Sequence, residues 1–377
     1  MWGLILLVFF TSFFVVLLST PSLIKVAILK RLFDAPGDER KLHTRMVPTI
    51  GGIIIFAGTL FSFSLWFPAE YLTTYDALRV PVTHFKYLIA TIIILFFVGV
   101  KDDIIGTAPI KKLVAHIIVG MILVLMADVR ITGLHGIFGI YELPYWASVF
   151  LSMFTYIVVV NAFNLIDGVD GLAAGIGTIC AIAFGTWFAF AGDFVMTCLA
   201  FALAGSLIGF LFFNFSPAKL FMGDSGSLTI GLIICVLAIN LIEFDQSKLN
   251  PFLDQLSKPV FVMSVLVYPL IDTLRIFIYR AVRGVSPFSA DRNHLHHALL
   301  DLGLNHRKIC YTLYLFNAII IGLSIALMYL NANYSFFIVG IFSLIMSQIP
   351  FFLKRKRFQL HNVKEEDEDQ FRQTARK

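Results

Sequence analysis

Long apolar runs recur from one end of the chain to the other, and they limit the fold more than any other feature of the sequence. A hydrocarbon core about 30 Å thick is crossed by about 20 helical residues, which is the length of these runs. They lack the alternation of apolar and polar residues that the strands of a membrane barrel require. The chain has 377 residues, of which 58% are hydrophobic and 14% charged, too apolar a composition for a soluble domain. The sequence therefore predicts an all-α polytopic membrane protein.

About eleven transmembrane helices are predicted. Their approximate ranges are residues 2–24, 50–67, 84–100, 112–128, 145–161, 172–191, 194–213, 226–243, 259–279, 309–329 and 334–353. The first run has no basic segment before it and no small-residue cleavage site after it, so we expect it to be retained as a span. Residues 1–353 would form one membrane domain, and residues 354–377 a charged, disordered cytoplasmic tail.

The distribution of Lys and Arg predicts the orientation of these spans. Of the 29 Lys and Arg residues, 24 lie in loops that follow odd-numbered spans and 5 lie in the other loops. Because cytoplasmic loops carry the excess of positive charge, the N-terminus is predicted outside and the C-terminus inside. The same asymmetry accounts for the net charge of +5, so a nucleic-acid partner is not expected. The four cysteines fall in or beside apolar runs at irregular spacing, which predicts inert core thiols.

Two adjacent carboxylates, Asp102 and Asp103, follow the third predicted span. Because like charges repel, a site that keeps both near apolar surroundings usually supplies a cation or lets one carboxyl keep a proton. Two solvated residues just beyond a helix end, with Lys101 beside them, explain the pair equally well. Lys111 and Lys112 close the same loop, either as anchors that extend to the membrane surface or in position to meet phosphate.

Four hydrogen-bonding side chains recur at every third residue where the fifth span ends, namely Asn161, Asn164, Asp167 and Asp170. On a helix this spacing forms a slowly rotating polar stripe. The two Asp-Gly pairs would break the helix and let the backbone approach a ligand closely. A polar turn explains the glycines but not a run of Asn and Asp without any Lys or Arg, so the pattern favours a binding site.

Two further segments carry isolated charged residues near span ends. Asp224 stands between glycines just before the eighth span, where the amides of a new helix favour an anion. An ordinary helix N-cap explains Asp224 as well. Asp272 and Arg275 lie three residues apart near the end of the ninth span. This spacing predicts a structural ion pair first and a phosphate-positioning arginine second.

Three of the nine histidines, His294, His296 and His297, lie together in the loop after the ninth span. Clustered histidines often bind zinc. No cysteine joins them, however, and the Asp-rich loops predicted on the same face favour a hard cation with oxygen ligands, such as Mg²⁺. With Arg292 beside them, these histidines predict recognition of a pyrophosphate at the membrane interface.

Taken together, these segments resemble the polyprenyl-phosphate N-acetylhexosamine-1-phosphate transferases (glycosyltransferase family 4), which include bacterial translocase I of peptidoglycan synthesis. The resemblance covers nearly the whole chain. It is carried, in order, by residues 48–52, 102–103, 161–171, 221–226 and 294–297. Residues 286–297 are most similar to the branch that makes lipid-linked N-acetylglucosamine for lipopolysaccharide O-antigen, common antigen or teichoic acid linkage units. Some members have a third acidic residue in an Asp-Asp-x-x-Asp pattern, where this chain has Gly106.

The resemblance implies a reaction and assigns residues to it. N-acetylglucosamine 1-phosphate would pass from UDP-N-acetylglucosamine to undecaprenyl phosphate in the bacterial inner membrane, on its cytoplasmic face, and UMP would be released. Asp224 would bind Mg²⁺ or Mn²⁺, and Asp102 or Asp103 would deprotonate or position the lipid phosphate. The implied nucleotide pocket consists of Asn164, Asp167, Asp170, Asn214 and Phe221. The implied sugar and pyrophosphate contacts are Lys111, Lys112, Asn161, Arg292, His294, His296 and His297.

Two alternatives stay open at this point. The donor could be another UDP-N-acetylhexosamine or the UDP-N-acetylmuramoyl-pentapeptide. A protein of a different class, an ion-coupled transporter, would place its carboxylates near the middle of the membrane and show inverted repeats. The predicted polar residues lie at span ends instead, and no internal repeat is evident. The sequence leaves the oligomeric state open, a homodimer included.

Overall fold

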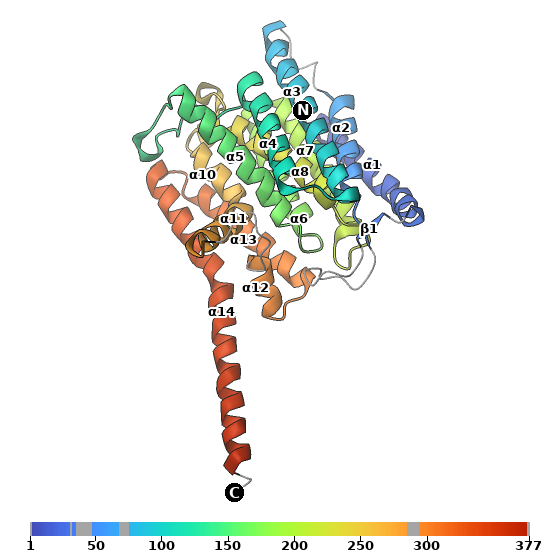
Figure 1. Ribbon diagram of the computed structural model, residues 1–377. Coiled ribbons are helices and arrows are strands. Elements are labelled where there is room, and N and C mark those ends of the chain that lie inside the picture. Colours follow the sequence, from blue (N-terminus) through green and yellow to red (C-terminus); the bar gives the residue numbers. More distant parts are fainter. Residues whose placement is uncertain (1, 31, 35–46, 68–74, 285–293, 375–377) are drawn as a thin grey trace.

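The computed structural model describes residues 2–30, 32–34, 47–67, 75–284 and 294–374, and for residues 33–34, 75–85 and 358–374 it describes the backbone alone. Helices make up nearly all of the described structure (Figure 1). One antiparallel pair of short strands, β1 (Phe33–Asp34) and β2 (Val47–Pro48), aligns Phe33 with Pro48. The prediction of an all-α membrane protein is confirmed.

The long helices correspond to the predicted spans. They are α1 (Trp2–Leu29), α2 (Gly51–Leu65), α3 (Tyr75–Ile105), α4 (Pro109–Met121), α5 (Tyr145–Leu165), α6 (Leu172–Ala191), α7 (Phe194–Asn214), α8 (Gly223–Ile242), α10 (Lys258–Val265), α11 (Val267–Val282), α13 (His306–Ala326) and α14 (Ala332–Thr374). Shorter pieces are η2 (Ile122–Met126), η3 (Ile137–Gly139), η4 (Gln246–Lys248), α9 (Pro251–Asp254) and α12 (Leu295–Asp301). Among the described residues, 8 helices are long and apolar enough to cross a membrane, or 9 if the bent pair α10 and α11 forms one span. The total of eleven and the orientation stay predictions.

Helix α8 forms the core of the bundle. It contacts α2, α3, α5, α6 and α7, and nearly all of its residues are buried (Figure 1). An apolar helix surface in a membrane can face lipid or other helices, and the surface of α8 faces other helices. The central position of α8 matters for function, because its first turn carries Asp224.

Glycines allow two neighbours to approach α8 closely. A Cβ atom on Gly99 of α3 would lie 2.4 Å from the Cα of Ser225 in α8, and a Cβ on Gly231 of α8 would lie 2.8 Å from the Cα of Val160 in α5. Small residues at helix crossings are typical of membrane bundles, where close packing replaces the hydrophobic effect between helices. The contact at Gly99 brings the end of α3 against the beginning of α8.

The ninth predicted span is broken. Helices α10 and α11 meet at an angle of 77°. Pro269 has no N–H to bond the carbonyl of Val265, which breaks the helical pattern there. Asn317 of α13 donates to that carbonyl at 3.1 Å and accepts from the amide of Tyr268 at 3.4 Å. The break therefore leaves these backbone groups satisfied inside the bundle, as a membrane interior requires.

Helix α14 projects from the bundle and continues to Thr374 (Figure 1). The sequence analysis predicted disorder after residue 353, which stays a prediction, although the described backbone is helical to Thr374. The segment from 351 to 374 contains neither Pro nor Gly and is rich in Glu, Lys, Arg and Gln. These residues favour a helix, so the last span continues beyond its apolar part. The four cysteines are free and buried, as predicted.

Candidate active site

A cavity of about 290 Å³ opens where the ends of α3, α5, α7 and α8 meet. Five of its lining residues are carboxylates that are far apart in the sequence. The lining consists of Thr49, Asp102, Asp103, Asp167, Gly168, Val169, Asp170, Asn214, Phe221, Gly223 and Asp224. All three residues predicted to be catalytic and four of the five predicted to bind the nucleotide therefore lie around one cavity. The fifth, Asn164, reaches the same site through Asp224.

The end of α3 caps the start of α8. The carboxylate of Asp103 accepts hydrogen bonds from the backbone amides of Asp224 at 2.6 Å and Ser225 at 3.1 Å, and from the Ser225 hydroxyl at 2.7 Å. The first amides of a helix have no partner within the helix, and a carboxylate is well suited to bind them. Asp103 thus serves as the cap of α8 from another helix, a role that the sequence analysis assigned to Asp224 as an alternative.

Lys112, in the first turn of α4, joins two carboxylates of the cavity. Its ammonium lies 2.7 Å from Oδ2 of Asp102 and also forms an ion pair with Oδ2 of Asp224. The other oxygen of Asp224 accepts a hydrogen bond of 2.9 Å from the Asn164 amide, which also donates to Ser227 at 3.0 Å. Asp102, Asp224, Lys112 and Asn164 therefore form one network of charges and hydrogen bonds at the cavity.

The members of the predicted polar stripe, residues 161–171, do not all reach the cavity, because α5 ends within the stripe. Asn164 lies in the last turn of the helix and points to Asp224, whereas Asn161 donates to the carbonyl of Ile157 in its own helix at 2.7 Å. Asp167 and Asp170 lie in the turn that follows. The helix ends before the stripe is complete, so Asn161 is the one member that the structure does not bring to the cavity.

The turn between α5 and α6 is held by residues from two other helices. Gly171 has a φ of +86°, and its amide donates to Oδ1 of Asn214 at 3.0 Å. The Asn214 amide in turn donates to the carbonyl of Leu220 at 2.9 Å. Oδ2 of Asp170 accepts from the Ala218 amide at 3.2 Å and lies 3.4 Å from Nδ1 of His306. Asn214 and Asp170 thus shape the wall of the cavity through backbone contacts.

Asp167 contributes a carboxyl group with an altered acidity. Burial raises the pKa of Asp167 well above its usual value, and the negative charges of Asp224, Asp103 and Asp170 raise it further. Carboxylates gathered without enough positive charge favour proton uptake or a cation. The cavity therefore has the electrostatic character of a cation site.

The segment from Pro48 to Gly52 joins the site through its backbone. Phe221 donates its amide to the carbonyl of Pro48 at 2.8 Å, and its own carbonyl accepts from the amide of Gly51 at 2.9 Å. A Cβ atom on Gly51 would lie 2.5 Å from the carbonyl oxygen of Phe221. This close approach explains the glycine pair, and it places Thr49 in the lining of the cavity. Thr49 was missed as a site residue, although it belongs to a motif that the sequence analysis noted.

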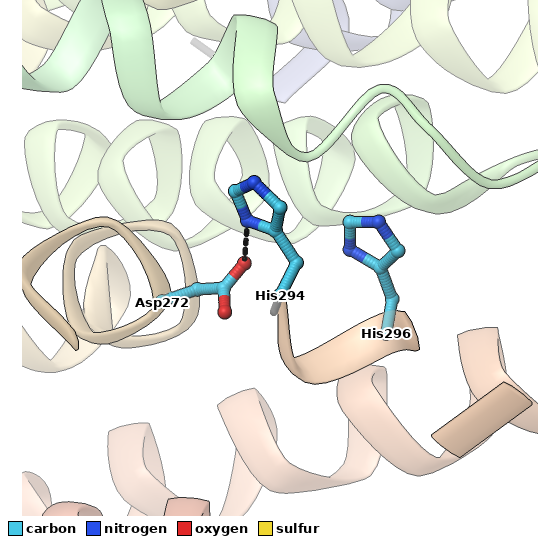
Figure 2. A group of neighbouring side chains, drawn as sticks. All are labelled: Asp272, His294 and His296. Carbon is cyan, nitrogen blue, oxygen red and sulfur yellow. Dashed lines mark hydrogen bonds and ion pairs between the residues drawn. The ribbon is translucent and has the colours of Figure 1, made fainter. Parts of the chain in front are cut away.

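The histidine tract begins α12 and packs against α11 (Figure 2). Nδ1 of His294 lies 2.8 Å from Oδ2 of Asp272, and both side chains are buried. The rings of His294 and His296 are nearly parallel, with an interplanar angle of 10° and centroids 5.3 Å apart. The ring of His297 lies 4.4 Å from that of His296. The predicted Asp272–Arg275 pair is longer, at 3.9 Å, so His294 is the closer partner of Asp272.

The histidines border the cavity at Gly168. A Cβ atom on Gly168 would lie 3.2 Å from Nε2 of His296. Burial lowers the pKa of His296 to about 3, so this imidazole is neutral near pH 7. His296 therefore adds a ring and hydrogen-bonding atoms to the edge of the cavity, but no positive charge.

One predicted contact, Lys111, does not join the network of Lys112, Asp102 and Asp224. Lys111 is exposed in the first turn of α4, whereas its neighbour Lys112 turns toward Asp102 and Asp224. Arg292 lies outside the residues that the structure describes. Side-chain direction, which the sequence alone does not reveal, separates the two adjacent lysines.

Two groups of side chains have the donor atoms for a metal ion. The cavity supplies carboxylate oxygens, which suit hard cations such as Mg²⁺ and Mn²⁺. The second group is Asp272, His294 and His296, whose ligand atoms lie within 4.8 Å of one another. Nδ1 of His294 contacts Oδ2 of Asp272, and the other oxygen of Asp272 accepts a hydrogen bond from the amide of Leu295.

Apolar helices whose ends surround an acidic cavity define a multi-pass membrane protein with a polar site at one end of its bundle. The chain belongs to glycosyl transferase family 4, and the family pattern matches residues 85–242. It is an enzyme of the transferase class, and the resemblance inferred from five motifs is confirmed.

Relatives named for one type of reaction extend over most of the chain. The undecaprenyl-phosphate alpha-N-acetylglucosaminyl 1-phosphate transferase of Salmonella typhi is 30% identical over 357 residues, 93% of this chain and 88% of the relative. The protein of the same name from Escherichia coli strain K12 is 29% identical, covering 87% of this chain and 84% of the relative. The decaprenyl-phosphate N-acetylglucosaminephosphotransferase of Mycolicibacterium smegmatis is 31% identical, covering 75% and 72%.

Proposed function

We propose that the protein transfers N-acetylglucosamine 1-phosphate from UDP-N-acetylglucosamine to undecaprenyl phosphate. The products are undecaprenyl-pyrophosphoryl-N-acetylglucosamine and UMP, and the reaction is the first membrane step of a cell-surface polysaccharide pathway. The names of the relatives support this donor and a polyprenyl phosphate acceptor. We place the protein in the bacterial inner membrane with the cavity on the cytoplasmic side, which the Lys and Arg distribution supports.

The observation that carries the proposal is the network of Asp102, Lys112 and Asp224 at the cavity. In the reaction, an oxygen of the lipid phosphate attacks the donor phosphorus that bears the sugar. The bond from that phosphorus to the oxygen shared with the uridine-bearing phosphate breaks, and UMP leaves with that oxygen. Both reactants are anions, so a site for this step needs positive charge and accurate positioning.

The contacts of the two adjacent carboxylates support different roles for them. Asp103 accepts three hydrogen bonds from the start of α8, so its oxygens are already occupied. Asp102 pairs with the ammonium group of Lys112. We therefore assign the proton-accepting or phosphate-positioning role to Asp102, and to Asp103 the positioning of Asp224.

We propose that Asp224 holds the cation. Asp102 and Asp167 line the same cavity and would share in binding it. A bound Mg²⁺ or Mn²⁺ ion would supply charge neutralisation at the donor pyrophosphate. Lys112 would remain as a second positive group that contacts the transferred phosphate. Phe221 and the turn of residues 166–171 would form the walls against which the nucleotide lies.

The proposal is tested by incubating purified protein with radiolabelled UDP-N-acetylglucosamine, undecaprenyl phosphate and Mg²⁺. We expect label that is soluble in chloroform and an equal amount of UMP. UDP-N-acetylgalactosamine and UDP-N-acetylmuramoyl-pentapeptide, supplied as competitors, identify the preferred donor. Asp254→Asn, an exposed substitution in α9, is the matched control for Asp→Asn variants of the site. Absence of both products with every donor would contradict the proposal.

An ion-coupled transporter is the alternative from another class. Its coupling carboxylates would lie near the middle of the membrane. Asp102 and Asp103 lie in the last turn of α3, and Asp224 lies in the first turn of α8. Carboxylates at helix ends favour a reaction at the membrane surface, where a soluble nucleotide sugar and a lipid phosphate can meet.

A further inference from the structure

Asp272 holds the beginning of α12 at two points. Its Oδ2 lies 2.8 Å from Nδ1 of His294, and its Oδ1 accepts a hydrogen bond of 2.7 Å from the amide of Leu295 (Figure 2). Asp272 is 1% exposed and His294 is 5% exposed. A carboxylate is costly to bury unless its oxygens are satisfied, and here both are. This pair connects α11 to the histidine tract.

A second side chain of α11 supports the same arrangement. Tyr268 lies one helical turn before Asp272, and its hydroxyl is 3.5 Å from Nδ1 of His296. The two histidine rings are stacked nearly parallel. Each ring thus turns its Nδ1 toward a buried polar group of α11. Figure 2 shows the other ring nitrogen of His294 pointing away from Asp272.

The hydrogen bond to a carboxylate determines where the proton of a neutral imidazole lies. A carboxylate only accepts, so Nδ1 of His294 carries the hydrogen and Nε2 has the free lone pair. Carboxylate–histidine pairs fix tautomer and ring orientation in this way in catalytic and metal sites.

We infer that Asp272 is a positioning residue for the transfer reaction, which fixes the tautomer and the orientation of His294 and, through the start of α12, holds His296 at the cavity wall. The inference rests on the proposed function for the identity of the substrate. The geometry that supports it is independent of that function: the same short segment places His296 against Gly168 in the cavity wall. Movement of the start of α12 would therefore move both histidines relative to the substrate.

Two other interpretations of Asp272 are weaker. As the ion-pair partner of Arg275 it would be structural only, but that contact is 3.9 Å, against 2.8 Å to His294. As a metal ligand with His294 and His296, it would have to give up the hydrogen bond to Nδ1. Direct ligation by Nδ1 would also remove the hydrogen that this nitrogen carries.

The first experiment measures the tautomer of His294 in the unaltered protein. Protein labelled with ¹⁵N at histidine is reconstituted in lipid nanodiscs, and the His294 signals are identified by their loss in His294→Gln. At a pH where the ring is neutral, the nitrogen shifts reveal which nitrogen carries the hydrogen. We expect the hydrogen on Nδ1. A hydrogen on Nε2 in the unaltered protein would overturn the inference, whatever the activity.

The second experiment uses Asp272→Asn, which preserves shape. The Asn carbonyl can still accept from Leu295, while its amide can donate to Nδ1 of His294 and so move the hydrogen to Nε2. We expect the NMR signature to change to that tautomer and kcat to fall about 10- to 100-fold, the range for such orienting partners. The KM for undecaprenyl phosphate should stay within about twofold, because the Asp102 and Lys112 network is untouched.

Two control variants distinguish the loss of the positioning contact from a general loss of folding or activity. Asp301→Asn makes the same chemical change in the exposed last turn of α12 and should alter neither tautomer nor kcat. Asp272→Glu keeps the carboxylate, so it should restore the Nδ1 tautomer and part of kcat. An unchanged kcat in a folded Asp272→Asn protein would overturn the inference. So would stoichiometric zinc in the purified protein that is lost in Asp272→Asn. If no donor supports transfer but the tautomer changes as expected, the positioning geometry stands and the proposed function fails.

Discussion

The carboxylate of Asp103 accepts a hydrogen bond of 2.6 Å from the backbone amide of Asp224, although 121 positions separate the two residues. This contact connects the end of α3 to the beginning of the central helix. It also gives the adjacent residues Asp102 and Asp103 different surroundings. The Asp103 carboxylate binds the first amides of α8, whereas the Asp102 carboxylate pairs with Lys112.

Alanine substitutions should separate the two carboxylates. Asp103→Ala removes three hydrogen bonds from the start of α8 and should lower the free energy of unfolding by about 1–3 kcal/mol. Asp102→Ala removes one partly exposed ion pair and should change stability by less than about 1 kcal/mol while abolishing turnover. Thermal unfolding and product formation, measured on the same preparations, test this. Equal stability of the two variants would contradict the capping role of Asp103.

Asp224→Asn should abolish turnover and weaken the dependence on Mg²⁺. The side-chain oxygen of the new Asn can still accept the hydrogen bond from Asn164, so the fold is expected to persist. The negative charge that attracts the cation is lost. We expect a fall in kcat of at least about 100-fold, comparable to removal of one preorganised electrostatic contact. Rates measured over a series of Mg²⁺ concentrations provide the test. Normal activity in this variant would remove the metal assignment.

Lys112→Met should strengthen the binding of Mg²⁺, whereas Asp224→Asn should weaken it. The ammonium group that neutralises Asp102 and Asp224 is removed, so these carboxylates should bind Mg²⁺ more tightly and half-maximal activity should be reached at a lower concentration. At saturating Mg²⁺ the rate should still be far below normal, because the contact with the transferred phosphate is lost. Lys111→Met, at the exposed neighbour, is the matched control. A higher Mg²⁺ requirement in Lys112→Met would contradict this account.

Ionisation of Glu243, which directly follows α8, should make the free energy of unfolding depend on pH. Burial alone would raise the pKa of Glu243, but the nearby His135 ring and hydrogen bonds from the amide and hydroxyl of Thr132 lower it below its ordinary value of 4.5. A lowered pKa in the folded state means that the ionised group stabilises the protein above its ordinary pKa. This contribution disappears as the pH falls through the lowered value. The difference in melting temperature between the unaltered protein and Glu243→Gln should therefore be constant near pH 7 and vanish in acid. A difference that does not depend on pH would contradict the role of ionisation.

Much of the architecture follows from local pattern. Each predicted span overlaps a helix, or for residues 259–279 a bent pair, because a long apolar run has no other stable form in a membrane. The break at Pro269 was not predicted, since it depends on Asn317 from a distant helix to satisfy the freed carbonyl. Disorder of the tail after residue 353 was predicted from its charge and stays a prediction, while the helix-forming residues there continue the backbone of α14.

For the site, the residue patterns together with the family resemblance selected most of the residues that line the cavity. Asp102, Asp103, Asp224, Asp167, Asp170, Asn214 and Phe221 all line it. Their individual roles were not accessible, because neighbours such as Lys111 and Lys112 differ only in the direction of their side chains. Asp272 was paired with Arg275 on the basis of helical spacing, whereas the closer partner is His294, 22 residues away.

The sequence by itself determined that this chain forms a helical membrane protein of glycosyl transferase family 4, because apolar length and ordered polar motifs are properties of the linear chain. Only the tertiary structure decided which polar atoms meet. Asp103 binds the start of α8, Lys112 joins Asp102 to Asp224, and Asp272 orients His294. Hydrogen bonds and ion pairs act over about 3 Å, so these partnerships exist only after packing has brought distant helix ends together.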